Sequence, residues 1–135
     1  MRSLGLDIGD KRIGVALSDP GGILASPFTI VERGAVERDI EAIVDIVARQ
    51  EVKQIVIGLP RSMDGTVGQQ AAKVEAFVEQ LRRHTDVPIE FRDERLSTVS
   101  ARRLVRSGRQ KGRKKVRYDA AAAAVILQGY LEEGR

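Results

Sequence analysis

Three groups of acidic residues, far apart in the sequence, stand where a folded chain could use them for chemistry. Asp7 lies in the apolar stretch LGLDIG, Asp93 and Glu94 follow the stretch VPIEF, and Asp119 opens a long alanine-rich segment. A carboxylate in a buried strand costs free energy unless a partner compensates its charge. Oxygen ligands without histidine or cysteine nearby suit hard cations, Mg²⁺ or Mn²⁺. Such ions can activate water for attack at phosphorus, so the acids indicate a metal-dependent hydrolase site.

Each acid also has an ordinary structural explanation, which the sequence leaves open. Asp7 could form an ion pair with Lys11 or Arg12. The pair of acids after VPIEF could belong to a solvated turn, and nothing in the pattern chooses between Asp93 and Glu94. An acid such as Asp119 in the first turn of a helix interacts favourably with the helix dipole. The combination of all three groups favours the metal site.

The residues beside Asp7 on its own strand face are glycines. Side chains alternate along a strand, so Gly5, Asp7 and Gly9 share one face. The next strand has small residues at alternate positions, Gly14, Ala16 and Ser18. This pattern predicts an open sheet surface around Asp7 that a ligand can approach closely.

The elements that must position these acids follow from the hydrophobic periodicity. Two alternating stretches joined by Gly9-Asp10-Lys11 predict a hairpin, and Pro27 predicts an edge position or a bulge in the third strand. Later strands alternate with helices and should be parallel. The expected strands are residues 3–9, 12–18, 23–31, 54–58 and 87–91; the expected helices are residues 35–50, 67–83, 97–107 and 118–133, with GRQKGRKK (108–115) as a loop.

These elements predict one α/β domain, residues 1–135, built on a five-stranded mixed sheet whose first three strands are antiparallel and which helices flank on both faces. The loop after the fourth strand, with Ser62 and Asp64, could line the site because it follows a parallel strand.

The charge distribution points to a polyanionic partner. The net charge is +4, but residues 101–117 hold nine of the 23 basic residues and none of the 19 acidic ones. The rest of the chain is therefore net acidic. A local imbalance of this kind favours contact with a nucleic acid over a solvated loop.

Composition excludes several classes of function. The chain has no cysteine, so disulfides, thiolate metal sites and cysteine nucleophiles are excluded. Five aromatic residues are too few for a binding surface of stacked bases. No apolar run approaches the ~18 residues of a membrane span, and the N-terminus lacks the layout of a signal peptide. A cytoplasmic protein without membrane contact is expected.

Four stretches together resemble a known family: LDIGDKRIGVALSD, IVIGLPRSMDG, FRDERLST and VRYDAAAAAVILQGYL. They are similar to the YqgF/RuvX family of Holliday-junction-resolvase-like nucleases, also described as pre-16S rRNA processing nucleases. The resemblance covers essentially the whole chain and implies an RNase H-like fold. It also implies a catalytic, metal-binding triad of Asp7, Glu94 and Asp119, and so selects Glu94 over Asp93. Asp10 stands where Thr or Tyr is frequent in the family.

The resulting prediction is a nuclease that uses Mg²⁺ or Mn²⁺ and acts on structured RNA, with the 5′ end of pre-16S rRNA favoured by the family description. A branched-DNA resolvase and a non-catalytic nucleic-acid-binding module are the alternatives. An actin-like nucleotide-binding enzyme is disfavoured, because 135 residues supply one lobe where that superfamily needs two. A monomer or a homodimer is expected. The residues expected to contact the nucleic-acid backbone are Lys11, Arg12, Arg109, Lys111, Arg113, Lys114, Lys115 and Arg117.

Overall fold

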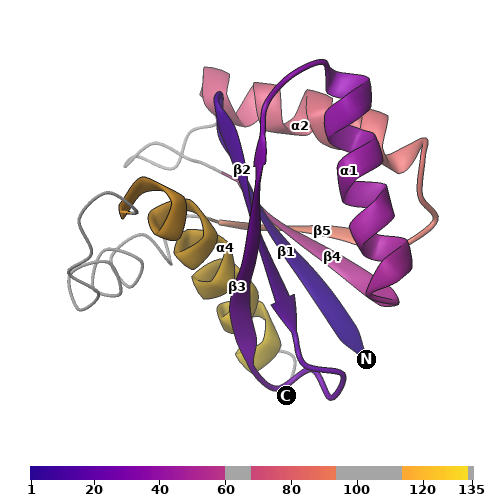
Figure 1. The fold of residues 1–135 in the computed structure, drawn as a ribbon, viewed down its shortest axis with the longest axis vertical. Coiled ribbons are helices and arrows are strands. Elements are labelled where there is room, and N and C mark those ends of the chain that lie inside the picture. Colours follow the sequence, from indigo (N-terminus) through magenta and orange to yellow (C-terminus); the bar gives the residue numbers. More distant parts are fainter. Residues whose placement is uncertain (60–67, 94–113, 134–135) are drawn as a thin grey trace.

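The computed structural model describes residues 1–59, 68–93 and 114–133, and in the last range it describes side chains from residue 120 onward. One five-stranded sheet lies between α1 and α2 on one face and α4 on the other (Figure 1). The strands are β1 (Arg2–Ile8), β2 (Arg12–Ser18), β3 (Ala25–Glu32), β4 (Val52–Leu59) and β5 (Ile89–Asp93); the helices are α1 (Val36–Arg49), α2 (Gln69–Arg82) and α4 (Lys114–Glu133).

The sheet is mixed, in the order β3-β2-β1-β4-β5. β1 pairs with β2 and β2 with β3 in antiparallel fashion, whereas β4 is parallel to both β1 and β5. The expected antiparallel start and parallel continuation are therefore confirmed. Pro27 lies on the edge strand β3, opposite Ala16, where the register shifts. A proline is tolerated there because its missing N–H interrupts a ladder that is already irregular.

Each face of the sheet carries its own core. On the α1/α2 face, alternate residues of β1 (Leu4, Leu6 and Ile8) pack with the apolar stripes of α1 and α2. On the α4 face the helix packs through two alanines and three large apolar residues. That core consists of Ala16, Val56, Ala123, Ala124, Ile126, Leu127 and Leu131. Small side chains let a helix lie close to a sheet, so the alanines allow α4 to approach the strands closely.

Several expected boundaries were wrong. α4 begins at Lys114 rather than at residue 118, so the end of the expected GRQKGRKK loop is helical. Lysine has good helix propensity, and charge and glycine content concealed the start of the helix. β5 begins after Pro88, at Ile89 rather than at residue 87, and ends at Asp93 rather than at residue 91. β3 begins at Ala25 rather than at residue 23, and β4 spans Val52–Leu59 rather than residues 54–58. The expected helix 97–107 and the loop with Ser62 and Asp64 lie outside the described residues.

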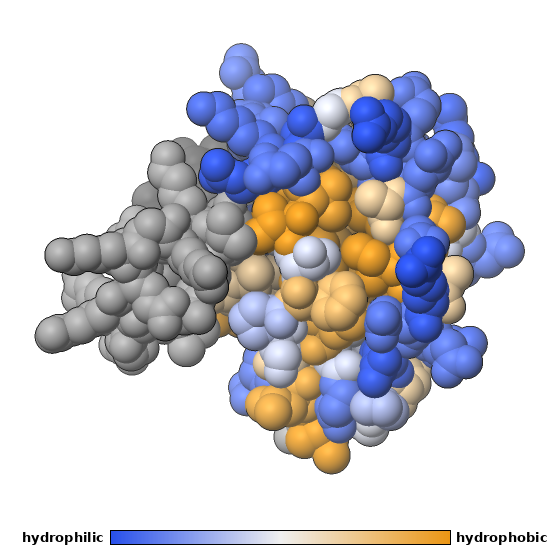
Figure 2. Space-filling view, viewed as in Figure 1, coloured by the Kyte–Doolittle hydropathy of each residue, from blue (hydrophilic) through white to orange (hydrophobic). Residues whose placement is uncertain are grey.

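The surface of the molecule in Figure 2 has separate hydrophilic and hydrophobic regions. Figure 2 shows hydrophilic residues over α2 and α1, with hydrophobic surface between them over the middle of the strands. The edge strand β3 also exposes an apolar side chain, since Phe28 is 46% exposed. None of the helices in the described ranges is long and apolar enough to cross a membrane.

Candidate functional site

Asp7 lies near the end of β1 on the α4 face and is half-buried. The residue directly opposite on β2 is Gly14. On the other side, one residue beyond the pair Leu6–Ile57, Asp7 is level with Gly58 of β4. Both neighbouring strands thus put a glycine beside Asp7, in addition to Gly5 on its own strand. Gly58 was missed at the sequence level, because its place beside Asp7 depends on the β1–β4 register.

The space beside Gly5 is filled by α4, so the expectation of open surface at this glycine was wrong. A Cβ atom placed on Gly5 would lie 2.8 Å from Leu127 Cβ and 2.9 Å from the Ala123 carbonyl oxygen. Both distances are shorter than real Cβ contacts. Gly5 therefore permits close approach of α4, and this approach brings the helix down to the strand that carries Asp7.

α4 runs antiparallel to β1. Near its C-terminal end, Tyr130 and Leu131 line a shallow pocket together with Met1 and Ser3 at the beginning of β1. Four to eight residues earlier in α4, Leu127 and Ala123 lie against Gly5. Moving from Gly5 to Asp7 covers about 7 Å along a strand, and moving back one turn from Ala123 to residue 119 covers about 6 Å along a helix.

The turn of α4 that contains Asp119 is therefore at the same end of the α4 face as Asp7. Asp119 lies in the second turn of the helix rather than in the first, as was expected, because α4 begins at Lys114. Its side chain lies outside the described part of the structure.

The register of β5 places Asp93, one of the two acids between which the sequence could not choose. In parallel pairing, Asp93 is level with Leu59 and Phe91 with Ile57, and both β4 residues belong to the α1/α2 core. Val56, which belongs to the α4 core, is instead level with Glu90. Residues 90 and 92 thus occupy α4-face positions, and Asp93 occupies a position on the opposite face from Asp7. Glu94 lies outside the described residues.

The C-terminal half of α4 is anchored to β5 by polar contacts. The Arg92 side chain, 13% exposed, forms an ion pair with Glu133. Its guanidinium group lies against the helix at Gly129, where a Cβ would come within 2.5–2.9 Å of three guanidinium atoms. Nearby, burial and the carboxylate of Glu90 raise the pKa of Tyr130 above its ordinary value of 10.0. These contacts join the C-terminal half of α4 to β5.

Two of the basic residues expected to bind nucleic acid lie at the β1–β2 hairpin. Lys11 is exposed in the turn, and Arg12 lies on the same sheet face as Gly14 and forms a 3.4 Å ion pair with Glu32 of β3. Asp10 lies in the hairpin turn, exposed and 3.6 Å from Lys73 of α2. An exposed pair of this kind contributes little to stability.

The remaining basic candidates lie at or before the start of α4. Lys114, Lys115 and Arg117 are in its first turn, without described side chains, and Arg109, Lys111 and Arg113 lie outside the described residues. Within the described part of the chain, no group of three potential ligand side chains gathers to hold a metal ion. Of the expected triad, that part contains the Asp7 side chain. A half-buried carboxylate oxygen with glycines on the neighbouring strands is a donor of the kind that hard cations accept.

A family model for RuvX, described as a Holliday junction resolvase, matches residues 1–133. The chain belongs to the RuvX family. Two curated relatives carry the name "Putative pre-16S rRNA nuclease". The protein of Desulforamulus reducens is 47% identical over 135 residues, covering 99% of this chain and 98% of the relative. The protein of Clostridium acetobutylicum is 45% identical over 132 residues, covering 97% and 98%. Membership assigns the chain to the nucleases, which are hydrolases of ester bonds.

Solved structures support the fold. RuvC of Thermus thermophilus superposes with a TM-score of 0.64 at 15% sequence identity, covering 99% of this chain and 97% of RuvC. The Fowlpox virus resolvase, solved with Holliday junction DNA, gives a TM-score of 0.60 at 12% identity, covering 98% of each chain. The expected RNase H-like fold is thus confirmed.

Proposed function

We propose that this nuclease depends on a divalent cation, Mg²⁺ or Mn²⁺, held by Asp7, Glu94 and Asp119. The observation that carries the proposal is that α4 runs antiparallel to β1 and lies close against Gly5. The turn with Asp119 and the half-buried Asp7 are thereby at one end of one face. The register of β5 supports Glu94 as the third ligand, since Asp93 occupies a position on the opposite face.

The donor set fits a hard cation, because all three side chains supply carboxylate oxygen. Such a cation, when bound, activates a water molecule and stabilises the leaving oxygen at phosphorus. Asp7 contributes a ligand from an ordered strand, which pairs with β2 at Gly14 and with β4 up to Leu6. Lys11 and Arg12 follow in the adjoining hairpin, where their charges can neutralise substrate phosphates next to the reacting bond.

The first turn of α4 supports a polyanionic substrate. It contains Lys114, Lys115 and Arg117 and no acidic residue. Cations at a helix N-terminus are unfavourable for the helix, whose dipole favours acids there. These basic residues therefore reduce the stability of the helix in the absence of substrate. Binding of substrate phosphates beside Asp119 would compensate for this cost. Arg109, Lys111 and Arg113 extend the same basic segment.

We favour structured RNA, the 5′ end of pre-16S rRNA, as the substrate, because the relatives at 42–47% identity are named for that RNA. Branched DNA is the second candidate, and the family description and the resolvases of similar fold support it. A non-catalytic module is the third. Phosphate contacts do not distinguish among these, since they carry no sequence information.

The test is a cleavage assay on matched pre-rRNA, single-stranded DNA and four-way junction substrates with Mg²⁺ or Mn²⁺. Asp7→Asn is expected to abolish cleavage and to leave substrate binding largely intact, because one neutral ligand weakens the metal site and leaves the basic residues unchanged. Full cleavage by Asp7→Asn in a clean preparation would refute the metal site. Calorimetric titration with Mn²⁺ distinguishes the metal-dependent nuclease from the non-catalytic binding module, because the module would bind no metal.

A further inference from the structure

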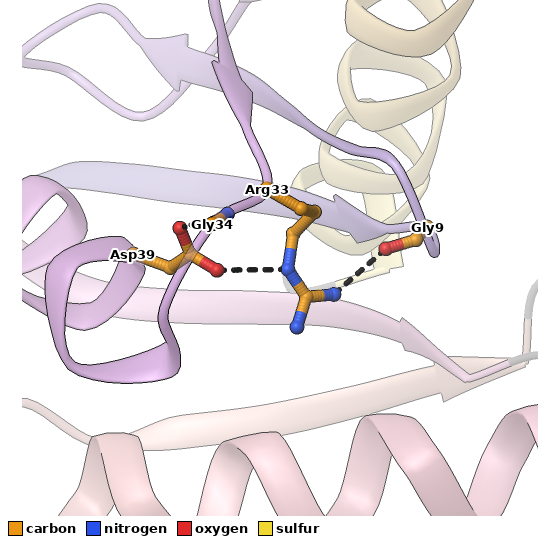
Figure 3. A network of polar contacts seen from close by, with 4 residues as sticks. All are labelled: Gly9, Arg33, Gly34 and Asp39. Atoms are coloured by element: carbon orange, nitrogen blue, oxygen red, sulfur yellow. Dashed lines mark hydrogen bonds and ion pairs between the residues drawn. The ribbon is translucent and has the colours of Figure 1, made fainter.

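Arg33, the residue immediately after β3, donates hydrogen bonds to two carbonyl groups in the turn of the β1–β2 hairpin. We call these two contacts the clamp. Its Nη1 donates a 2.7 Å hydrogen bond to the carbonyl oxygen of Gly9 (Figure 3). Its backbone N–H donates a 2.9 Å hydrogen bond to the carbonyl oxygen of Lys11. The carbonyl groups before and after Asp10 are thus both held by one residue.

A buried carboxylate holds the Arg33 side chain in this position. Asp39, in the first turn of α1, is 2% exposed and accepts hydrogen bonds from Arg33 Nε at 2.9 Å and from the Gly34 N–H at 3.1 Å. The guanidinium group also lies over the Phe77 ring of α2, 5.1 Å from its centroid. Arg33 therefore ties the hairpin to α1 and α2. The planar guanidinium group donates from two separate nitrogens, Nε to Asp39 and Nη1 to Gly9. A lysine ammonium donates from a single nitrogen on a flexible stem and does not reproduce this fixed geometry.

The clamp acts at the end of β1 that carries Asp7. Gly9 is two residues after Asp7, and its N–H donates a 2.9 Å hydrogen bond to the Arg12 carbonyl oxygen, which closes the hairpin. The antiparallel ladder before it ends with the pair Ile8–Ile13. Beyond that pair, the Gly9–Arg12 bond and the Arg33 contacts hold the backbone.

We propose that Arg33, together with Asp39, is a positioning residue of this nuclease. It fixes the hairpin so that the Asp7 carboxylate and the cations of Lys11 and Arg12 keep a constant relation to the bound phosphate. The inference rests on the proposed function of Asp7. It goes further, because Arg33 belongs neither to the acidic triad nor to the basic segment. The competing explanation is that the buried pair serves the stability of the fold alone.

Hydrogen exchange tests the clamp directly and needs neither metal nor substrate. In Arg33→Lys, which keeps the charge and loses the fork, the Gly9 N–H is expected to exchange at least tenfold faster than in the wild type. Exchange in the α1/α2 core should stay unchanged. Asp39→Asn keeps the shape of its side chain and should show the same change in weaker form. It also serves as the variant of choice if Arg33→Lys does not fold.

Kinetics well below the unfolding temperature then separate positioning from stability. Arg33→Lys should lower kcat between about 10- and 100-fold, since small misplacements of catalytic groups have effects of this size. KM should change little. The matched control is Val47→Ala, a truncation in the α1/α2 core that destabilises the fold without altering the clamp.

An equal loss of kcat in Val47→Ala and Arg33→Lys, compared at equal distance below their unfolding temperatures, would overturn the positioning role. Faster Gly9 exchange with unchanged kcat, or unchanged Gly9 exchange, would overturn it as well. Retained cleavage by Asp7→Asn is a different failure: it would remove the proposed metal site, while the exchange data would still report on the clamp.

Discussion

Substitution of Gly5 by alanine should move α4 away from β1 and so change the relative position of Asp7 and Asp119. The added Cβ would lie 2.8 Å from Leu127 Cβ and 2.9 Å from the Ala123 carbonyl oxygen. Neither neighbour is the flexible end of a side chain: one is a Cβ atom and the other is helix backbone. The helix as a whole must therefore move to accommodate the methyl group.

The size of the effect follows from these distances. Ordinary contacts begin near 3.4 Å, so α4 must move by about 0.6 Å. Overpacking of this kind costs roughly 1–3 kcal/mol, offset by about 0.4–1 kcal/mol because alanine restricts the unfolded chain. A net loss of about 1–2 kcal/mol lowers Tm by about 4–7 °C in a chain of this length. A displacement of about half an ångström between catalytic groups should reduce kcat about tenfold.

Thermal unfolding by circular dichroism and single-turnover cleavage measure the two effects. Gly34→Ala is the matched control, because a Cβ there has no neighbour within 4 Å and the substitution keeps the backbone N–H that donates to Asp39. It should leave the cleavage rate unchanged and Tm equal or slightly raised. If Gly5→Ala behaved like Gly34→Ala in both measurements, the close approach of α4 to β1 would not hold, and neither would the argument that places Asp119 near Asp7.

Two further predictions concern the contact of Arg92 with α4 at Gly129 and the hydrogen bonds of Asp19. Gly129→Ala should displace the Arg92 guanidinium rather than the helix, because the atoms in the way belong to a side chain; we expect a loss of about 1 kcal/mol in urea unfolding, with kcat largely kept. Asp19 accepts backbone N–H bonds from Leu24 and Ile23, which lower its pKa from 3.8. The charged carboxylate therefore contributes stability above that value, and the contribution is lost as pH falls through the lowered pKa. Asp19→Asn should thus have a lower Tm than wild type at neutral pH, and the difference should shrink in acid; a pH-independent difference would contradict this.

The sheet could be predicted from the sequence because its signals are local. Alternation predicted β1 and β2, helical spacing predicted α1 and α2, and Pro27 indicated an edge position or a bulge in β3 before any pairing was known. The start of α4 could not be predicted, since the positively charged stretch before Tyr118 reads equally well as a loop. Helix formation there depends on the packing of the residues that follow.

The candidate site was only partly predictable for a physical reason. Carboxylates in unusual positions are visible in a sequence, and Asp7 became a candidate in that way. Whether Asp93 points to the same face as Asp7 depends on the β4–β5 register, which no local pattern encodes. The contact of Arg33 with Gly9, 24 residues apart, depends in the same way on how β3 and α1 meet the hairpin.

The central claim is that Asp7 and Asp119 bind one metal centre at the end of β1. Anomalous difference maps from crystals grown with Mn²⁺ test it most directly. We expect a peak within coordination distance, about 2.0–2.6 Å, of carboxylate oxygens from Asp7, Glu94 and Asp119, and its loss in Asp7→Asn. A peak bound elsewhere in wild-type crystals, with the Asp7 carboxylate engaged by protein groups alone, would contradict it.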